Sequence, residues 1–156
     1  SPIYKCYMDI QGSRWYDAID LCLAEPGRII ATAGAKESLQ TTDRVWPVKV
    51  NAKSGRPLYC LYFDHNFWAG RLYRETIQHF DPKRHRPYAP ATYFASDTGD
   101  EYFHELMQEH EVWKNRKTIW ERVSQHAIND FGDCEKIGLV QDWCVRMSKE
   151  ARSTAN

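Results

Sequence analysis

The chain lacks the short motifs that identify most metal, nucleotide and nucleophile chemistries. None of its five cysteines stands in a Cys-x-x-Cys pair, and its six histidines form no His-x-His or His-x-x-x-His pair. These patterns supply zinc ligands, so a zinc site is not expected. There is no Walker P-loop, no glycine-rich dinucleotide fingerprint and no serine or cysteine nucleophile signature. Chemistry based on dispersed carboxylates is not excluded by any of these absences.

The chain also lacks net charge and long apolar runs. Lys plus Arg and Asp plus Glu number 21 each, so no overall basic character points to nucleic acid, although a local basic face can still bind it. No apolar run approaches the length of a membrane span, and no signal peptide is visible. The five widely spaced cysteines are typical of reduced thiols packed as small hydrophobes in an intracellular protein. With 156 residues, 42% of them hydrophobic, the chain can build one domain with a real core.

Strand and helix signals alternate at the start of the chain. Residues 3–8 are rich in β-branched and aromatic side chains and predict a buried strand that ends at Asp9. Ser13 is a good N-cap for the helix that follows, and residues 28–32 predict the next strand. A strand–helix–strand unit places its two strands side by side and parallel. Because strand-like sequence begins at Ile3, we expect the chain to be a fragment of a longer protein.

The remaining signals predict a mixed α/β domain. Two strands joined by a turn are expected, then an amphipathic helix, a short strand, a helix, a short strand and a last helix, in the order 44–50, 57–63, 64–79, 91–95, 97–108, 109–116 and 130–147. Together with the first unit, this order predicts an α/β fold, a mixed sheet flanked by helices, over residues 1–147. Residues 148–156 are expected to form a polar tail.

Three aspartates are candidate metal ligands. Asp9 follows a strand of the predicted parallel pair, and open α/β sheets bind ligands at the carboxyl ends of their strands. Asp130 and Asp133 lie one helical turn apart on one helix face, where carboxylates can hold a hard cation such as Mg²⁺. There are plainer alternatives. Asp9 can be a turn residue bonded to its own backbone, Asp130 a helix cap, and Asp133 a solvated acid in the first turn.

Two basic segments are candidate DNA contacts. Lys49, Lys53 and Arg56 surround the predicted turn at residues 51–56, and a second group lies in a proline-rich loop and comprises Lys83, Arg84 and Arg86. Lysine and arginine at such positions can hold the phosphate backbone. An ordinary solvated turn and a solubilising loop remain the alternative interpretations.

Four segments, in this order, resemble the nuclease domain of the large terminase subunit of tailed phages, of the lambda-like type. The first is the acidic strand end at Asp9, followed by a helix, a strand and Gly34-Ala35-Lys36. The others are residues 58–63 with the helix around 68–76, Tyr93-Phe94 with residues 101–109, and Trp120 followed by Asn129-Asp130 and Asp133-Cys134. The similarity covers nearly the whole chain.

The resemblance implies an RNase H-like fold and cleavage of double-stranded DNA by two Mg²⁺ or Mn²⁺ ions during genome packaging. It makes Asp9 and Asp133 catalytic metal ligands and Asp130 a third ligand or a partner of one. Lys36 would contact the scissile phosphate or simply pair with a nearby acid. It further implies a viral protein of the host cytoplasm. Its partners would be the terminase small subunit and the portal protein, and it would form a homo-oligomer in the packaging motor.

The chain departs from the family pattern at the site itself. The family's first catalytic strand would lie upstream of this sequence, Asp130 stands where the family has Glu, and Gly34-Ala35-Lys36 replaces a Lys-Gly pair. A non-catalytic DNA-binding or portal-docking module of the same fold therefore stays open. Another RNase H-like enzyme, such as a transposase or resolvase core, stays open too.

Overall fold

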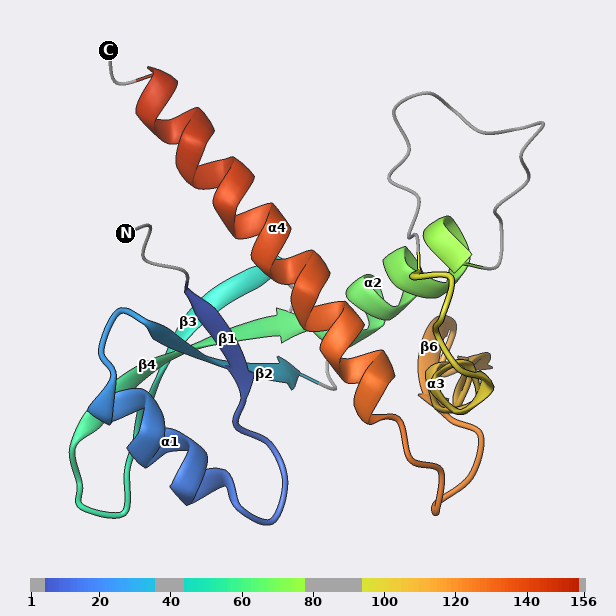
Figure 1. The fold of residues 1–156 in the computed structure, drawn as a ribbon, viewed down its shortest axis with the longest axis horizontal. Helices are drawn as coiled ribbons and strands as arrows, with labels where there is room; N and C mark the ends of the chain where they lie inside the picture. The colour runs from blue at the N-terminus through green and yellow to red at the C-terminus, as the bar shows by residue number, and fades with distance from the viewer. Residues whose placement is uncertain (1–4, 36–43, 78–93, 155–156) are drawn as a thin grey trace. The chain divides into compact units, whose positions relative to one another are not determined.

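The computed structural model describes residues 5–35, 44–77 and 94–154 (Figure 1). The chain divides into two compact units, one formed by residues 1–65 and 137–156 and the other by residues 66–136. The sequence predicted a single domain over residues 1–147. Each unit is described by itself below.

The first unit contains a four-stranded mixed sheet. Its strands are β1 (Cys6–Asp9), β2 (Ile29–Ala35), β3 (Val45–Asn51) and β4 (Pro57–Asp64), and their order is β1-β2-β4-β3. The β1–β2 and β2–β4 pairs are parallel, whereas β3 and β4 form an antiparallel hairpin. The predicted parallel pair and the predicted hairpin are both confirmed. The carboxyl ends of three parallel strands therefore share one edge of the sheet.

Helix α1 (Trp15–Ala24) covers the core of this unit. Ile19 and Cys22 are buried in one cluster with Ala31, Ala33 and Cys60 from the strands. The small side chains of β2 allow a helix to approach closely. The predicted cap at Ser13 is wrong, because Arg14 occupies the cap position and no side chain caps the helix.

The segment after β4 is divided into two kinds of helix. Residues 64–79 were predicted as one amphipathic helix, but α2 (His65–Ala69) is α-helical and η1 (Gly70–Ile77) is π-helical; residues 78 and 79 lie outside the described chain. Trp68, Ala69, Leu72 and Tyr73 are buried. Their spacing in adjacent pairs, one turn apart, gives the segment a single inward face.

The second unit continues with α3 (Asp100–Leu106) and the hairpin of β5 (Glu109–Lys114) and β6 (Lys117–Arg122). Strand β6 was not predicted. The predicted caps at Asp97 or Thr98 are wrong, since α3 begins after Gly99. Of the predicted strand 91–95, residues 91–93 lie outside the described chain, and Phe94 and Ala95 are not in a strand.

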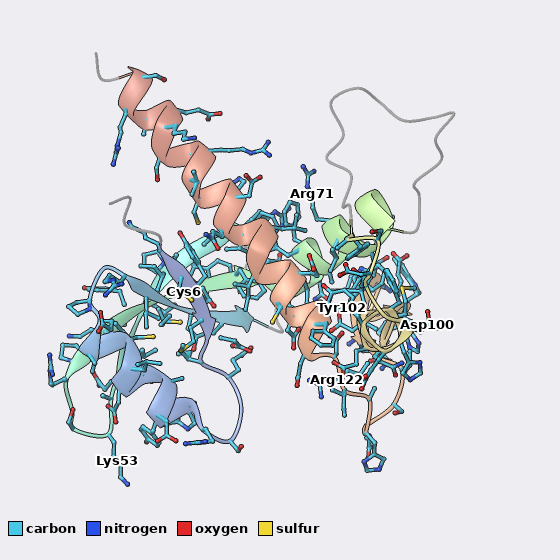
Figure 2. All side chains as sticks on the ribbon, viewed as in Figure 1. Cys6, Lys53, Arg71, Asp100, Tyr102 and Arg122 are labelled. Atoms are coloured by element: carbon cyan, nitrogen blue, oxygen red, sulfur yellow. The ribbon has the colours of Figure 1, made fainter. Side chains whose placement is uncertain are left out.

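A cluster of partly exposed aromatic rings connects α3 to the start of the last helix in the second unit. The ring of Tyr102 stacks on Phe131 with centroids 4.6 Å apart, and Phe94 meets Tyr102 and Phe103 edge-on at 5.7 and 5.1 Å. The Tyr102 hydroxyl also donates a hydrogen bond to Glu135. Tyr102 therefore ties α3 to the start of the last helix (Figure 2).

The last helix, α4 (Asp130–Thr154), is longer than predicted. The sequence placed its end at Met147, but residues 148–154 continue the helix, with exposed side chains at 148–153. Within the first unit, its residues pack near β1: the Gln141 side chain donates a hydrogen bond to the Lys5 carbonyl at 3.4 Å. Burial, then proximity to Cys144, raises the pKa of Tyr7.

Candidate metal centre

A buried lysine joins two carboxylates in the second unit. The Lys136 ammonium lies 3.0 and 2.9 Å from the two carboxylate oxygens of Glu109 and 2.7 Å from an oxygen of Asp133. The side chains of Lys136 and Glu109 are 0% and 4% exposed, and that of Asp133 is 32% exposed. Asp133 and Lys136 face the same way because they are three residues apart on α4. Glu109 reaches them from the start of β5.

This arrangement is unusual because charged side chains are almost never fully buried unless they are paired. Two acids against one ammonium leave the cluster one negative charge in excess. Asp133 is the partly exposed member of the cluster, and water or a solute can reach its carboxylate. The cluster can therefore attract a further cation to the carboxylate oxygens.

Tyr73 and Asn129 line the inner side of the same cluster. The Tyr73 hydroxyl donates a hydrogen bond to the Asn129 side-chain oxygen at 3.4 Å, and its ring stacks on Trp120 with centroids 4.9 Å apart. Burial, then the charges of Glu109 and Asp133, raise the pKa of Tyr73 well above its usual range. Tyr73 therefore stays a neutral phenol and adds no charge to the cluster.

Gly132 allows these groups to approach α4. A Cβ atom built at Gly132 would lie 2.5 Å from the Tyr73 hydroxyl oxygen and would overlap the Asn129 side chain. Real Cβ atoms do not come this close to other heavy atoms, so any side chain at residue 132 would displace Tyr73 or Asn129. The glycine is therefore a packing requirement of the cluster.

His65 completes a group of three potential metal ligands with Glu109 and Asp133. One ligand atom from each lies within 4.8 Å of the other two. His65 is the first residue of α2, a helix whose other residues belong to the same unit as Glu109 and Asp133. Carboxylate oxygens suit Mg²⁺ and Mn²⁺, whereas an imidazole nitrogen favours a transition ion. The donor set thus fits a divalent cation, with Mn²⁺ the better match of the two.

The Lys136 ammonium contacts the same two carboxylates. A divalent cation would have to use the oxygen lone pairs that Lys136 leaves, or displace the ammonium. Carboxylates accept hydrogen bonds at about four positions each, so sharing is chemically possible. Binding is expected to be weaker than at a cluster of acids alone.

The three aspartates predicted as ligands fall in different places. Asp133 belongs to the group of three. Asp130 is exposed at the first residue of α4 and is not part of that group. Asp9 ends β1 in the first unit, and its carboxylate accepts a hydrogen bond from the Gln11 backbone N–H at 2.9 Å. Asp9 therefore makes the local turn that was its alternative interpretation, and its place beside Asp133 stays a prediction.

A second acid occupies the same edge of the sheet as Asp9. Asp64 ends β4, is 3% exposed, and accepts a hydrogen bond from Arg44 at 3.1 Å. The Gln11 side-chain amide forms two hydrogen bonds at this edge: it donates to the Gly34 carbonyl at 2.9 Å and accepts from the Gly34 N–H at 3.0 Å. The sheet edge that was predicted to bind a ligand is thus acidic and well ordered by hydrogen bonds.

Sequence reasoning missed four of these residues: His65, Asp64, Glu109 and Lys136. His65 and Glu109 have no short spacing to other ligands, so no motif marks them. Asp64 had been assigned to a helix start, whereas the strand runs through it. Glu109 and Lys136 are brought together by a contact between the start of β5 and the first turns of α4, which the sequence does not reveal.

The predicted basic DNA contacts are partly described. Lys49, Lys53 and Arg56 are exposed on β3 and the β3–β4 turn, and Lys53 points away from the sheet at the end of that turn (Figure 2). Lys36, Lys83, Arg84 and Arg86 lie outside the described residues. Their role in DNA binding stays a prediction.

Comparisons with known proteins return no match: no protein-family model, no curated protein and no solved structure is similar to this chain. Among the described residues, no helix has both the length and the apolar character needed to cross a membrane.

Proposed function

We propose that this chain is the metal-dependent endonuclease domain of a phage DNA-packaging terminase, with an RNase H-like fold. The observation that carries the proposal is the grouping of Asp133 with Glu109 and His65, because Asp133 is an acid that the terminase resemblance marks as catalytic. The mixed sheet, with Asp9 at the carboxyl end of a parallel strand, supports the same reading. The substrate is double-stranded DNA, and the reaction is hydrolysis of a phosphodiester bond.

In this proposal Asp133, Glu109 and His65 hold a divalent cation, Mn²⁺ or Mg²⁺, and Asp9 supplies a further carboxylate. Bound divalent cations activate a water and stabilise the leaving oxygen of an in-line displacement at phosphorus. Lys136 orients the carboxylates of Glu109 and Asp133 and limits their mutual repulsion. The neutral Tyr73 phenol supports Asn129 without adding charge. Lys49, Lys53 and Arg56 guide the phosphate backbone.

The terminase assignment carries further proposals about the setting of the reaction. The domain would work in the host cytoplasm within a homo-oligomeric motor, together with the terminase small subunit and the portal protein.

A non-catalytic DNA-binding or portal-docking module is the second candidate, and Lys136 favours it. An ammonium that already contacts both carboxylates provides the charge that a metal would otherwise provide. A site that has lost its catalytic role would keep its fold by this means. The two candidates differ in whether added metal produces cleavage.

The test is cleavage of supercoiled plasmid with Mn²⁺ or Mg²⁺ by the parent chain and by Asp133→Asn, Asp9→Asn and Asp130→Asn. Asp142→Asn is the matched control, because Asp142 is an exposed acid on the same helix and pairs with Arg146. The nuclease proposal expects Mn²⁺ to support faster cleavage than Mg²⁺. It also expects loss of cleavage in the first two variants and retention in the control.

The opposite result also has a defined meaning. A parent chain that binds plasmid but never cuts it would support the non-catalytic module. Cleavage that survives both Asp133→Asn and Asp9→Asn would show that the catalytic site lies elsewhere.

A further inference from the structure

The β5–β6 hairpin presents an exposed tryptophan beside a cluster of cations. Trp113 is 72% exposed, more than any other large hydrophobic side chain that the structure describes. It stands one residue before the tip, which reads Lys114-Asn115-Arg116-Lys117. A tryptophan so placed contributes little to the core and leaves its ring face open to a partner.

Three of the four tip residues, Lys114, Arg116 and Lys117, are cationic. No acidic residue occurs between Glu111 and Glu121. The Lys114 ammonium is held by Glu121 at 2.6 Å. Arg116 and Lys117 are exposed, and neither forms an ion pair with any residue that the structure describes. Two cations therefore remain available to an anionic partner at this tip.

The turn keeps an arginine where glycine is the favourable residue. Asn115 and Arg116 have φ angles of 51° and 61°. A two-residue hairpin turn with positive φ at both positions strongly prefers Asn-Gly, because only glycine adopts the second conformation without steric cost. Asn115 follows this preference and Arg116 does not. Strain of this kind is concentrated at functional turns.

We propose that this hairpin tip binds single-stranded DNA, with Trp113 stacking on an unpaired base and Arg116 and Lys117 holding the adjacent phosphates. An aromatic face stacks on any base that has left the duplex, and cations beside it follow the backbone. A fully paired duplex offers Trp113 no free base face except at its ends. This inference deepens the proposed function and rests on it only in taking DNA as the substrate. The hairpin would bind a DNA strand that is unpaired at the cut or at a DNA end.

The experiment measures binding of a fluorescent oligothymidine and of a hairpin-capped duplex by anisotropy, over a salt series and with EDTA present. Removing metal separates binding from cleavage. Trp113→Ala should weaken oligothymidine binding about 5- to 150-fold, the fold-change that corresponds to the loss of one base–aromatic stack. Its salt dependence should stay unchanged. Trp113→Phe should restore most of the affinity, because the phenyl ring still stacks.

The cations make a different prediction. Arg116→Gly and Lys117→Gln should each weaken binding and lower the salt slope by about 0.7, the value for one phosphate contact on a single strand. Arg116→Gly should also keep or raise the melting temperature, because it relieves the turn. Lys149→Gln, an exposed cation on α4, is the matched control and should change neither quantity.

Several results would overturn the proposal. The first is that the parent chain fails to bind oligothymidine at low salt, and the second is that Trp113→Ala binds it within twofold of the parent. The third is that Trp113→Ala weakens binding of the single strand and of the capped duplex equally. Loss of binding in the hairpin variants without any cleavage by the parent would support this inference while the nuclease proposal fails. Metal-dependent cleavage with unaffected hairpin variants would do the reverse.

Discussion

Replacing Gly132 by alanine should destabilise the protein, whereas the same change at Gly138 should stabilise it. Both glycines lie in α4, where alanine is intrinsically favoured by about 1 kcal/mol. A Cβ at Gly138 meets nothing within 4 Å. A Cβ at Gly132 meets the buried Asn129 side chain and the Tyr73 hydroxyl. The pair therefore separates helix propensity from packing.

The magnitude follows from three contributions. Overpacking a well-filled interior costs about 1–3 kcal/mol, and loss of the hydrogen bond between Tyr73 and Asn129 costs about 1 kcal/mol. The alanine gain of about 1 kcal/mol offsets part of this. Gly132→Ala should thus lower the free energy of unfolding by about 1–3 kcal/mol, and Gly138→Ala should raise it by about 0.5–1 kcal/mol.

Urea unfolding followed by tryptophan fluorescence measures both variants, and Trp120 reports on the cluster because it stacks on Tyr73. Each 1 kcal/mol corresponds to roughly 2–4 °C in melting temperature for a chain of this size. If Gly132→Ala proves as stable as Gly138→Ala, Tyr73 and Asn129 move aside freely. The close packing around residue 132 would then not be a constraint on the site.

Three further predictions concern the buried charges and thiols. Lys136→Met removes the ammonium that pairs with the buried Glu109 carboxylate and should cost about 3–5 kcal/mol, with part of the lost melting temperature recovered by Mn²⁺; an unchanged melting temperature would refute the pairing. Ellman's reagent should label Cys6 and Cys134, which are exposed, much faster than Cys60, which is buried; early reaction of Cys60, located by peptide mapping, would count against its burial. Burial raises the pKa of the Cys60 thiol from 9.0 to about 12, so the unfolded chain loses this proton first and the free energy of unfolding should fall as pH rises above 9.0. Cys60→Ala should show a shallower decline in urea titrations at successive pH values, and an equal slope would contradict the assignment.

The sheet of the first unit was predictable because its signals are local. A strand, a helix and a strand separated by Pro26-Gly27 leave few topologies, and a turn of six residues between two apolar runs favours a hairpin. Strand β6 was missed because Thr118 and Ile119 are too few to reveal a period of two. The π-helical η1 was missed because propensity does not distinguish it from an α-helix.

The candidate site was less predictable because its contacts join distant parts of the chain. Asp133 was identified from its one-turn spacing to Asp130, yet the structure pairs it with Lys136 and groups it with Glu109 and His65. A fully buried lysine is rare enough that no sequence pattern favours it. Lys136 can be buried because it pairs with Glu109, and the two residues are too far apart in the sequence for the pairing to be predicted.

The Lys136–Glu109 ion pair also affects how the protein can be handled. Carboxylates that share a site without any counter-charge repel one another until a cation binds. Here the counter-charge is part of the polypeptide, so folding of the second unit does not have to wait for a metal. The domain should survive purification in chelator. Under the proposed nuclease function, a cation would then bind late, after DNA.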